Sequence, residues 1–399
     1  MTKTTTSSAA HTLETANLAN NCHLCGSPAL REFPAYTKVA RVTSDCKNWP
    51  AGGHFAICEC CGYPQTVVNS RWREEIKEIY NRYTIYYQGE GTEQSVFDPV
   101  AGGPRRRSDV IVDRLLQTCK LPRSGALLDV GCGNGNFFKA FTPARPQWSL
   151  DGLEWDNKHE ADNRKLPAFR KLHLGSLEAV DQAYNLISII HCLEHVPNPA
   201  KLLKEARALL APDGILLIQV PDCSTNPFYL SVADHCSHFS VESLAALVQS
   251  CGFDLVQAGN SWVSKEVSII AKKSASFASR LPKIDARLGQ QLTSYIDWLT
   301  LTAEHAKNAA RNTTQPFGIF GRAIAGTWLY SSVGQSTGFF VDEDPSRIGQ
   351  HYLDRPIFAP GQVPDGAVVY IGLPPAIASS IQRRLLPKSA FWVVPPTLG

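Results

Sequence analysis

The apolar residues of this chain fall into short runs, with polar and glycine-rich turns and helical patterns between them. Strands that alternate with helices predict a mainly parallel sheet covered on both faces, with ligands bound at the carboxyl ends of the strands. The predicted strands of this sheet span residues 126–130, 148–153, 169–174, 185–190, 215–220, 253–258 and 267–271. The predicted helices span residues 136–141, 200–210 and 241–251.

Further elements are predicted on either side of this sheet. An amphipathic helix begins at Arg71 and leads into a run of tyrosines up to Tyr87, and a second helix covers 110–119. Helical periodicity between 274 and 311 predicts a long linker helix or a helix pair. A strand at Phe317, a glycine turn, a helix and further strands then predict a second, smaller Rossmann-like unit, with its last strands at 368–371 and 391–394.

Composition narrows the class of protein. Of the 399 residues, 44% are hydrophobic and 19% are charged, as in a soluble globular protein, and this length favours two or three domains. The net charge of +3 is too small to indicate a nucleic-acid or membrane partner. Residues 1–20 lack the apolar core of a signal or anchor, and no later apolar run is long enough to span a bilayer. We therefore expect a cytoplasmic protein, monomeric or homodimeric.

The turn after the first strand of the sheet carries a ligand-binding pattern. Asp129 ends the apolar run and is followed by glycines at alternate positions, of which Gly131 and Gly133 allow positive φ and leave the backbone amides bare. Glu154 ends the next strand, about 20 residues on, where an acceptor for a ribose hydroxyl is expected. The Gly-x-Gly-x-Gly spacing differs from the dinucleotide pattern. The sequence predicts a nucleotide-binding turn, and the alternative is a purely structural one.

Cysteine spacing predicts a metal site near the N-terminus. Cys22 and Cys25 form one Cys-x-x-Cys knuckle, and Cys58 and Cys61 form a second one after 32 intervening residues. Two such knuckles make a closed tetrahedral zinc site, which can organise a module that has little core of its own. Because no ligand position is left open, we predict a structural Zn²⁺. Cys60 is an alternative within the second knuckle, and four unrelated buried thiols are the alternative to a site. Outside candidates are Cys46, His23 and His54.

Titratable residues gather in two segments after later strands. His191, Glu194 and His195 follow the fourth strand, and Asp234 and His235 lie in a loop before the next helix. A histidine titrates near neutral pH and can accept a proton, while a neighbouring carboxylate can orient it or hold substrate hydroxyls. The alternative is that the histidines of the later loop only cap the helix.

Two other clusters allow both a packing and a binding interpretation. Tyrosines follow the helix that begins at Arg71, and one of them would face substrate if the cluster is not simply packed. The basic run Arg105–Arg107 is either solvated surface or, for a nucleotide-linked substrate, a phosphate contact. The tyrosines are Tyr80, Tyr83, Tyr86 and Tyr87.

The glycine turn followed by Leu153-Glu154 resembles the cofactor site of class I S-adenosylmethionine (SAM) methyltransferases. The segments 184–199 and 211–214, the latter expected as the turn into the fifth strand, resemble the same enzymes in the same order. Ser176 stands where many members carry an aspartate near the adenine. The resemblance implies a seven-stranded Rossmann-like α/β sheet and SAM as cofactor. The cofactor-binding residues that it implies are Asp129, Gly131, Gly133, Gly135, Glu154, Ser176, Leu177 and His191.

The order of the parts resembles the zinc-containing nucleotide-sugar C-methyltransferases, which modify keto-deoxysugars of antibiotics and cell-surface glycans. Asp234-His235 matches the pair whose histidine is the base, and His195 matches a second active-site histidine. One tyrosine of the group Tyr83, Tyr86 and Tyr87 matches a substrate tyrosine, and we take Tyr87. The tail departs from the family because 324–327 lack the lysine that commonly follows its glycine turn.

The resemblance implies a division of the chain into five parts. These are a disordered tail (1–20), a zinc-binding module with substrate-side tyrosines (21–100), a SAM-dependent methyltransferase domain (101–273), a helical linker (274–314) and a small C-terminal Rossmann-like α/β domain (315–399). The last part either binds a nucleotide or acts as a scaffold that closes the substrate cleft.

The implied reaction begins with proton removal by His235 from a carbon next to a keto group. The resulting enolate attacks the methyl group of SAM, while His195 or Tyr87 stabilises the enolate oxygen. O-methylation of a sugar or other small metabolite is an alternative that removes a more acidic proton. A non-catalytic SAM-binding scaffold is a second alternative, and the retained Asp129 and Glu154 argue against it.

Overall fold

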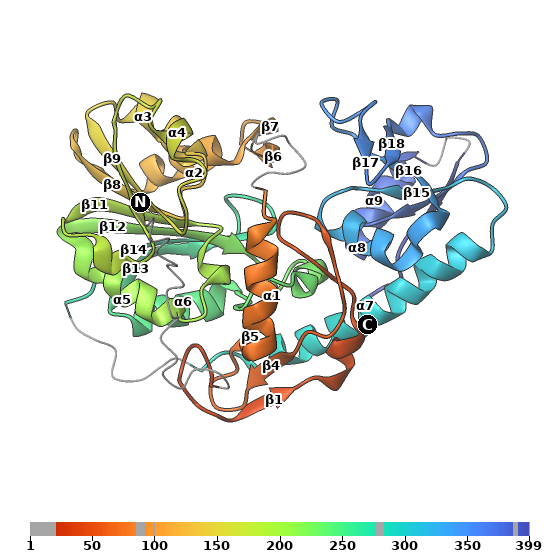
Figure 1. Ribbon diagram of the computed structural model, residues 1–399, viewed down its shortest axis with the longest axis horizontal. Helices are drawn as coiled ribbons and strands as arrows, with labels where there is room; N and C mark the ends of the chain where they lie inside the picture. Colours follow the sequence, from red (N-terminus) through yellow and green to blue (C-terminus); the bar gives the residue numbers. More distant parts are fainter. Residues whose placement is uncertain are drawn as a thin grey trace, which may run out of the picture.

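The computed structural model describes residues 21–84, 93, 95–98, 100–275, 283–385 and 390–398. A central sheet and a C-terminal sheet form two lobes, and the long helix α7 (Ala286–Arg311) runs beneath them (Figure 1). Within the described residues, no helix combines the length and the apolar character that a bilayer crossing needs.

The central sheet has seven strands. They are β8 (Gly125–Val130), β9 (Trp148–Glu154), β10 (Phe169–Leu174), β11 (Tyr184–Ile190), β12 (Leu210–Pro221), β13 (Phe253–Gly259) and β14 (Glu266–Lys273). Their order is β10-β9-β8-β11-β12-β14-β13, and only β14 runs antiparallel to its neighbours. The order reverses between β8 and β11, so the carboxyl ends of these two strands flank the crevice in which such sheets bind ligands. The seven strands predicted from the sequence are confirmed.

Helices cover both faces of the central sheet. On one face lie α2 (Arg107–Thr118) and α3 (Asn136–Ala144), and on the other α5 (Pro199–Leu209) and α6 (Val241–Ser250) (Figure 1). Because side chains alternate along a strand, Leu127 joins the first apolar layer and Leu128 the second. The short helix α4 (Glu160–Asn163) stands between β9 and β10.

One predicted turn is part of a strand. The segment Ala211–Gly214, expected to lead into the fifth strand, lies inside β12, which begins at Leu210. Tyr184 pairs with Leu210, and Leu186 pairs with Ile215. The register between β11 and β12 therefore shifts at this point, and the residues of β12 between these two pairs are extra. The strand continues because β11 offers pairing partners on both sides of this irregularity. The local Pro-Asp-Gly sequence is typical of a turn and gives no sign of this pairing.

The N-terminal segment contains short strands and one helix. The three-stranded sheet consists of β1 (Leu30–Glu32), β4 (Phe55–Cys58) and β5 (Pro64–Thr66), and β2 (Arg41–Val42) pairs with β3 (Asn48–Trp49). The helix α1 (Ser70–Asn81) is capped by the Asn69 side chain, which accepts the Trp72 N–H. The hairpin β6 (Ser95–Asp98) and β7 (Gly103–Arg106) leads into α2. Tyr83 lies beyond the end of α1, whereas Tyr86 and Tyr87 lie outside the described residues.

The C-terminal sheet has the order β17-β18-β16-β15-β19-β20, and only β17 is antiparallel to its neighbour. Its strands are β15 (Phe317–Phe320), β16 (Thr337–Val341), β17 (His351–Tyr352), β18 (Arg355–Phe358), β19 (Val368–Ile371) and β20 (Phe391–Val393). The helices α8 (Ile324–Val333) and α9 (Pro375–Leu385) complete this lobe. The predicted strands at 317, 368–371 and 391–394 are present, whereas β17, β18 and α9 were not predicted.

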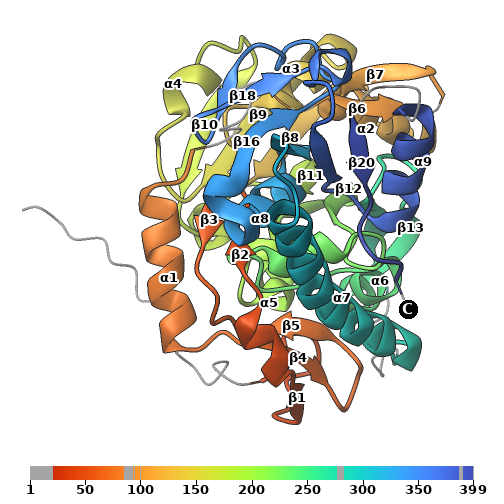
Figure 2. The ribbon, with the colours of Figure 1, turned by 90° about the vertical axis from the view of Figure 1, so that its right-hand side faces the viewer.

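The C-terminal lobe is tied to the N-terminal segment by buried polar contacts. Trp328 of α8 is 1% exposed, and its indole N–H donates to the Ala40 carbonyl at 2.7 Å. The Tyr352 hydroxyl donates to the Cys46 carbonyl at 2.8 Å. The helix α7 lies beside α8 (Figure 2) and also contacts the 3₁₀ helix Pro34–Lys38 of the N-terminal segment, so it connects the same two parts along a second path.

Candidate active site

The loop after β8 has the backbone that the glycine pattern predicts. Gly131, Gly133 and Gly135 have φ values of 76°, 49° and 76°. A Cβ on Gly131 would stand 2.8 Å from the Cβ of Cys192, and one on Gly135 would stand 2.2 Å from Oδ1 of Asn163. Both the backbone conformation and the packing therefore require glycine here.

Two carboxyl groups stand beside this loop. The Gly133 N–H donates to Oε1 of Glu154 at 2.6 Å, and the buried Asp129 accepts the Ser188 hydroxyl at 2.7 Å. Burial raises the pKa of Asp129 to about 7, although the Ser188 hydrogen bond opposes this shift. Burial also raises the pKa of Glu154. The partners of these carboxyl groups within the described part of the chain are uncharged hydrogen-bond donors, namely the Ser188 hydroxyl for Asp129 and the N–H groups of Gly133 and Trp155 for Glu154.

The predicted cofactor residues Ser176 and Leu177 follow β10, the strand that pairs with β9. Ser176 is exposed and precedes a short 3₁₀ helix (Leu177–Ala179). The Leu177 side chain is 2% exposed and belongs to the apolar core, so only its backbone can meet a ligand. The Gly175 N–H donates to the Glu154 carbonyl, which fixes this turn beside the acidic residue.

The predicted cofactor residue His191 lies between two carboxylates. It directly follows β11 and adopts a positive φ of 49°. Its Nε2 lies 3.1 Å from Glu266 and its Nδ1 lies 3.5 Å from Glu194. Burial disfavours the imidazolium, but these carboxylates outweigh it and raise the pKa of His191 to about 9. Arg107 binds the same Glu266 at 2.9 Å, so a buried row of alternating charges runs along this edge.

The predicted catalytic residues His195, Asp234 and His235 meet. His195 Nδ1 lies 3.0 Å from the Asp234 carbonyl oxygen and 3.4 Å from its carboxylate. The rings of His195 and His235 are nearly perpendicular, with centroids 4.8 Å apart. Asp234 is fully buried and accepts both the N–H and the hydroxyl of Ser44, at 2.8 and 2.5 Å. Burial raises the pKa of Asp234 and lowers that of His235 well below its usual value, so His235 is neutral near pH 7.

The loop that carries Asp234 and His235 is held by the N-terminal segment. The Thr66 hydroxyl donates to the His235 carbonyl at 2.9 Å, and the Trp72 indole N–H donates to the Ala233 carbonyl at 3.0 Å. From the other side, the Cys236 N–H donates to the Glu194 carbonyl at 2.8 Å. The histidines therefore do not serve as the cap of α6, a role that the Ser240 side chain fills.

Tyr80 is a tyrosine that approaches these histidines. Its ring centroid lies 6.4 Å from that of His195, and burial raises its pKa well above the usual value. The predicted Tyr87 lies outside the described residues. Tyr80 is half-buried and lies eight positions after Trp72, one of the buried residues of α1, and this helical spacing was the available signal for its inward direction.

Three further residues belong to the candidate site, and the sequence offers little or no indication of their roles. Glu194 was placed beside the crevice without a role, and its side chain is 2% exposed between His191 and His195. Glu266 lies at the site because β14 pairs antiparallel with β12. Ser44 binds Asp234, which lies 190 positions later in the sequence. No local motif marks either residue.

The basic run at 105–107 is bound to carboxylates of the chain itself. Arg105 pairs with Asp98 at 2.9 Å, Arg106 with Asp109 at 2.8 Å, and Arg107 with Glu266. These guanidinium groups brace the β6–β7 hairpin and α2, so their arrangement does not favour the phosphate interpretation.

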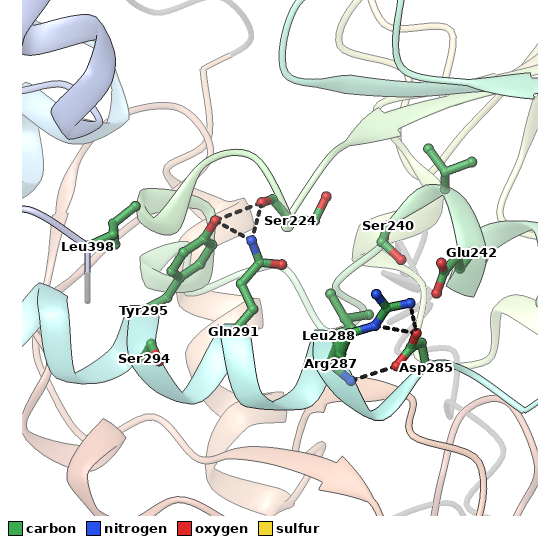
Figure 3. A pocket seen from close by; sticks show the side chains of 11 residues that line it. Ser224, Ser240, Glu242, Asp285, Arg287, Leu288, Gln291, Ser294, Tyr295 and Leu398 are labelled. Carbon is green, nitrogen blue, oxygen red and sulfur yellow. Dashed lines mark hydrogen bonds and ion pairs between the residues drawn. The ribbon is translucent and has the colours of Figure 1, made fainter.

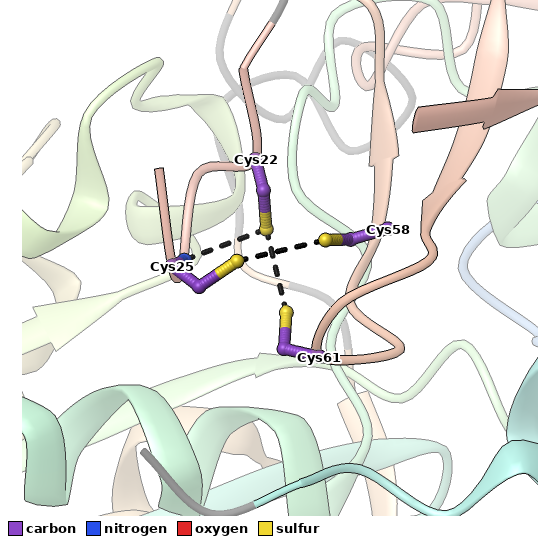
Figure 4. A group of neighbouring side chains, drawn as sticks. All are labelled: Cys22, Cys25, Cys58 and Cys61. Carbon is purple, nitrogen blue, oxygen red and sulfur yellow. Dashed lines mark hydrogen bonds between the residues drawn. The ribbon is translucent and has the colours of Figure 1, made fainter. Parts of the chain in front are cut away.

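The four predicted metal ligands form a single cluster (Figure 4). The Sγ atoms of Cys22 and Cys61 are 3.5 Å apart, and those of Cys25 and Cys58 are 3.6 Å apart. Zn–S bonds of about 2.3 Å in a tetrahedron place sulfurs about 3.8 Å apart, so the cluster is compatible with zinc. The alternative ligand Cys60 is exposed and outside this cluster.

A groove of about 630 Å³ lies along α7 (Figure 3). Its walls include Tyr295 and Gln291, which both bind the Ser224 carbonyl, and the N-cap residue Asp285. None of the predicted site residues lines it.

Comparison with known proteins identifies the central part of the chain. A family described as "Methyltransferase domain" matches residues 104–258. This range contains the glycine turn, Glu154, His195 and His235, and its sheet has seven mostly parallel strands. Residues 104–258 therefore match a methyltransferase domain.

Curated relatives of this methyltransferase domain have different named activities. A trans-aconitate 2-methyltransferase of Variovorax paradoxus is 32% identical over 116 residues, 28% of this chain and 45% of the relative. A ubiquinone biosynthesis O-methyltransferase of Haemophilus ducreyi is 26% identical over 27% of this chain and 49% of the relative. The C-methyltransferase NovU of Streptomyces niveus is 26% identical over 160 residues, 37% of each chain. The chain thus spans less than half the length of each of these relatives.

The raised pKa of Asp129 predicts how stability depends on pH. Because the folded chain holds this proton up to about pH 7, whereas an ordinary aspartate releases it near 3.8, the free energy of unfolding falls as the pH rises through this interval. The contribution is on the order of 4 kcal/mol. Asp129→Asn removes this decline. Urea unfolding at pH 4 to 8 measures the slope, and the exposed Asp213→Asn is the control. An unchanged slope in Asp129→Asn contradicts the assignment.

Proposed function

We propose that the chain transfers a methyl group from SAM to a carbon atom of a nucleotide-linked keto-deoxysugar. The observation that carries the proposal is the meeting of neutral His235, His195 and the buried Asp234 beside the crevice of the methyltransferase domain. A carbon acceptor needs a base to remove a weakly acidic proton next to a keto group. Oxygen and nitrogen acceptors depend less on such a base.

The crevice residues fit SAM as the bound cofactor. The loop amides that were expected to be free are occupied within the chain, since the Gly131 N–H donates to the Leu153 carbonyl and the Gly133 N–H to Glu154. The absence of side chains on these glycines still leaves space for a ligand beside the loop, and Glu154 suits ribose hydroxyls. The buried carboxyl of Asp129 has a hydroxyl partner but no ion pair in the described chain, and the ammonium group of SAM would supply the missing charge. SAM, when bound, supplies an electrophilic methyl group on its sulfonium.

His235 is the proposed base. Burial keeps its imidazole neutral, so a lone pair is available near pH 7. His195, whose Nδ1–H is held by Asp234, is proposed to stabilise the enolate oxygen as an imidazolium that donates from Nε2, with Tyr80 behind it in place of the expected Tyr87. The surrounding burial excludes water, which would otherwise protonate a carbanion.

The C-terminal lobe is proposed to receive the nucleotide end of the substrate. Ser44 binds Asp234, and two positions later the Cys46 carbonyl accepts the Tyr352 hydroxyl, so this lobe reaches the catalytic loop. Arg322 is 4% exposed at the same edge, with its guanidinium carbon 5.9 Å from the Tyr352 ring centroid. Its guanidinium also pairs with Asp342 at 3.6 Å, so a diphosphate bound here would compete with that carboxylate. We also propose that the cluster of four cysteines holds a structural zinc.

A second candidate is O-methylation of a small metabolite, which the similarity to the ubiquinone biosynthesis O-methyltransferase favours. The same histidines would then remove a hydroxyl proton. The position of the added methyl group separates the two candidates.

We expect SAM binding to depend on Gly133. In Gly133→Val a branched side chain occupies the space above the amides and resists the positive φ, so calorimetry should detect no SAM binding. The control Gly349→Val makes the same change at a positive-φ glycine in open space far from the crevice. Equal SAM affinity in Gly133→Val and the wild type would remove the proposed cofactor site.

We expect a methyl group on carbon. The full chain is incubated with methyl-labelled SAM and a panel of nucleotide-linked keto-deoxysugars, and NMR locates the added carbon. A new C–CH₃ group supports the proposal, and a new O–CH₃ group supports the second candidate. Absence of transfer to every sugar and to phenolic or carboxylate acceptors would support the scaffold alternative.

We expect His235→Ala to stop proton removal without affecting SAM affinity. With the reactive keto-sugar and S-adenosylhomocysteine in D₂O, the wild type should exchange the proton next to the keto group. The variant should do so about 10² to 10⁴ times more slowly, the usual contribution of a general base. The exposed His351→Ala is the control. Exchange at the wild-type rate in His235→Ala means that another group is the base.

A further inference from the structure

Three side chains of the catalytic cluster have the composition of a metal site. Glu194, His195 and His235 each offer a ligand atom, and these atoms lie within 4.8 Å of one another. Glu194 and His195 come from the short 3₁₀ helix after β11 (Leu193–His195), and His235 comes from the loop before α6. The contact between the Cys236 N–H and the Glu194 carbonyl fixes these two segments to each other.

The hydrogen bonds of His195 leave a lone pair directed at a carboxylate. Its Nδ1 lies 3.0 Å from the Asp234 carbonyl oxygen, which can only accept, so Nδ1 carries the proton. In the neutral imidazole the other nitrogen, Nε2, has a lone pair, and it lies 3.9 Å from Oε1 of Glu194. Two acceptors face each other at a distance too long for a hydrogen bond, and a cation between them would bind both. A histidine held by a backbone carbonyl in this way is the usual arrangement for a metal ligand.

The other two ligands also have unused acceptors. The Glu194 side chain is 2% exposed, and its Oε2 has no hydrogen-bond partner in the described part of the chain. An unpaired buried carboxylate oxygen is costly. His235 is 5% exposed, and within the described residues no hydrogen bond to its ring nitrogens is formed. The cluster therefore presents acceptors on two buried side chains, Glu194 and His235, and on the half-buried His195.

We propose that Glu194, His195 and His235 bind one divalent transition-metal ion, with Zn²⁺ as the test case, and that the ion inhibits methyl transfer. Two imidazoles and one carboxylate suit Zn²⁺, whose bonds of about 2.1 Å place tetrahedral ligands about 3.4 Å apart. Closing the cluster from its present separations takes shifts of about 1 Å, within the range of side-chain rotations. This site is separate from the cluster of four cysteines, which has sulfur ligands only.

The inhibition rests on the proposed function. A base uses the lone pair of its nitrogen to accept a proton, and a metal bound to that nitrogen of His235 occupies the same lone pair. The ion and the substrate proton therefore compete for one group. The reaction itself needs no metal in this scheme, so removing the ion restores turnover.

The experiment is a Co²⁺ titration of the full chain as isolated. Co²⁺ bound by nitrogen and oxygen gives visible d–d absorption, whereas Co²⁺ bound by cysteine adds a sulfur-to-metal charge-transfer band in the near ultraviolet. We expect one Co²⁺ per chain with d–d absorption and no new thiolate band. Glu194→Gln and His235→Ala should lose this absorption, and the exposed His351→Ala should retain it. Far-ultraviolet circular dichroism checks that each variant is folded.

The outcomes separate the two proposals. No d–d absorption in the wild type, or equal absorption in folded Glu194→Gln, overturns the metal site. Where the site binds, Zn²⁺ beyond the first equivalent should lower the methyl-transfer rate, and a chelator should restore it. A rate that rises with Zn²⁺ overturns the inhibitory role. A chain that binds Co²⁺ as expected but methylates no acceptor contradicts the proposed function and leaves the metal site standing.

Discussion

The burial of the Asp234 carboxylate is the constraint on which the candidate site depends. A carboxyl with no exposed surface needs compensating hydrogen bonds, and Ser44 supplies two of them from a turn 190 positions earlier in the chain. Asp234 also orients His195, through both its carbonyl oxygen and its carboxylate. The N-terminal turn, the catalytic loop and the segment after β11 can therefore take up their native positions only together.

The N-terminal segment acts as a support for the catalytic loop. Thr66 and Trp72 donate to the carbonyls of residues 235 and 233, on either side of Asp234. His23, inside the first cysteine knuckle, lies 3.3 Å from the Ser237 hydroxyl. A module with short strands has little core with which to hold such contacts, so the cross-link that a metal provides would be transmitted directly to the loop.

Sequence patterns predicted the elements and the ends of the strands better than they predicted the contacts. Asp129, Gly131 and Glu154 could be predicted because they belong to one glycine turn and one strand end, where the residue types required are set by neighbouring positions in the sequence. Glu266 and Ser44 were missed because they reach the site through strand pairing and packing between distant segments. Tyr80 was predicted only as a member of a tyrosine cluster, and its approach to His195 depends on how α1 packs in the fold. The role of the basic run 105–107 depended on Asp98, Asp109 and Glu266, which only the fold brings beside it.

The contact between Tyr352 and Cys46 has a consequence for the order in which the molecule is made. Synthesis proceeds from the N-terminus, and domains generally fold as they emerge. The methyltransferase core can form once β14 has left the ribosome, but the turn that holds Asp234 gains its outer partner only when residue 352 appears. For the last part of translation this turn therefore lacks the contact that Tyr352 supplies, so the surroundings of Asp234 are complete only in the nearly finished polypeptide.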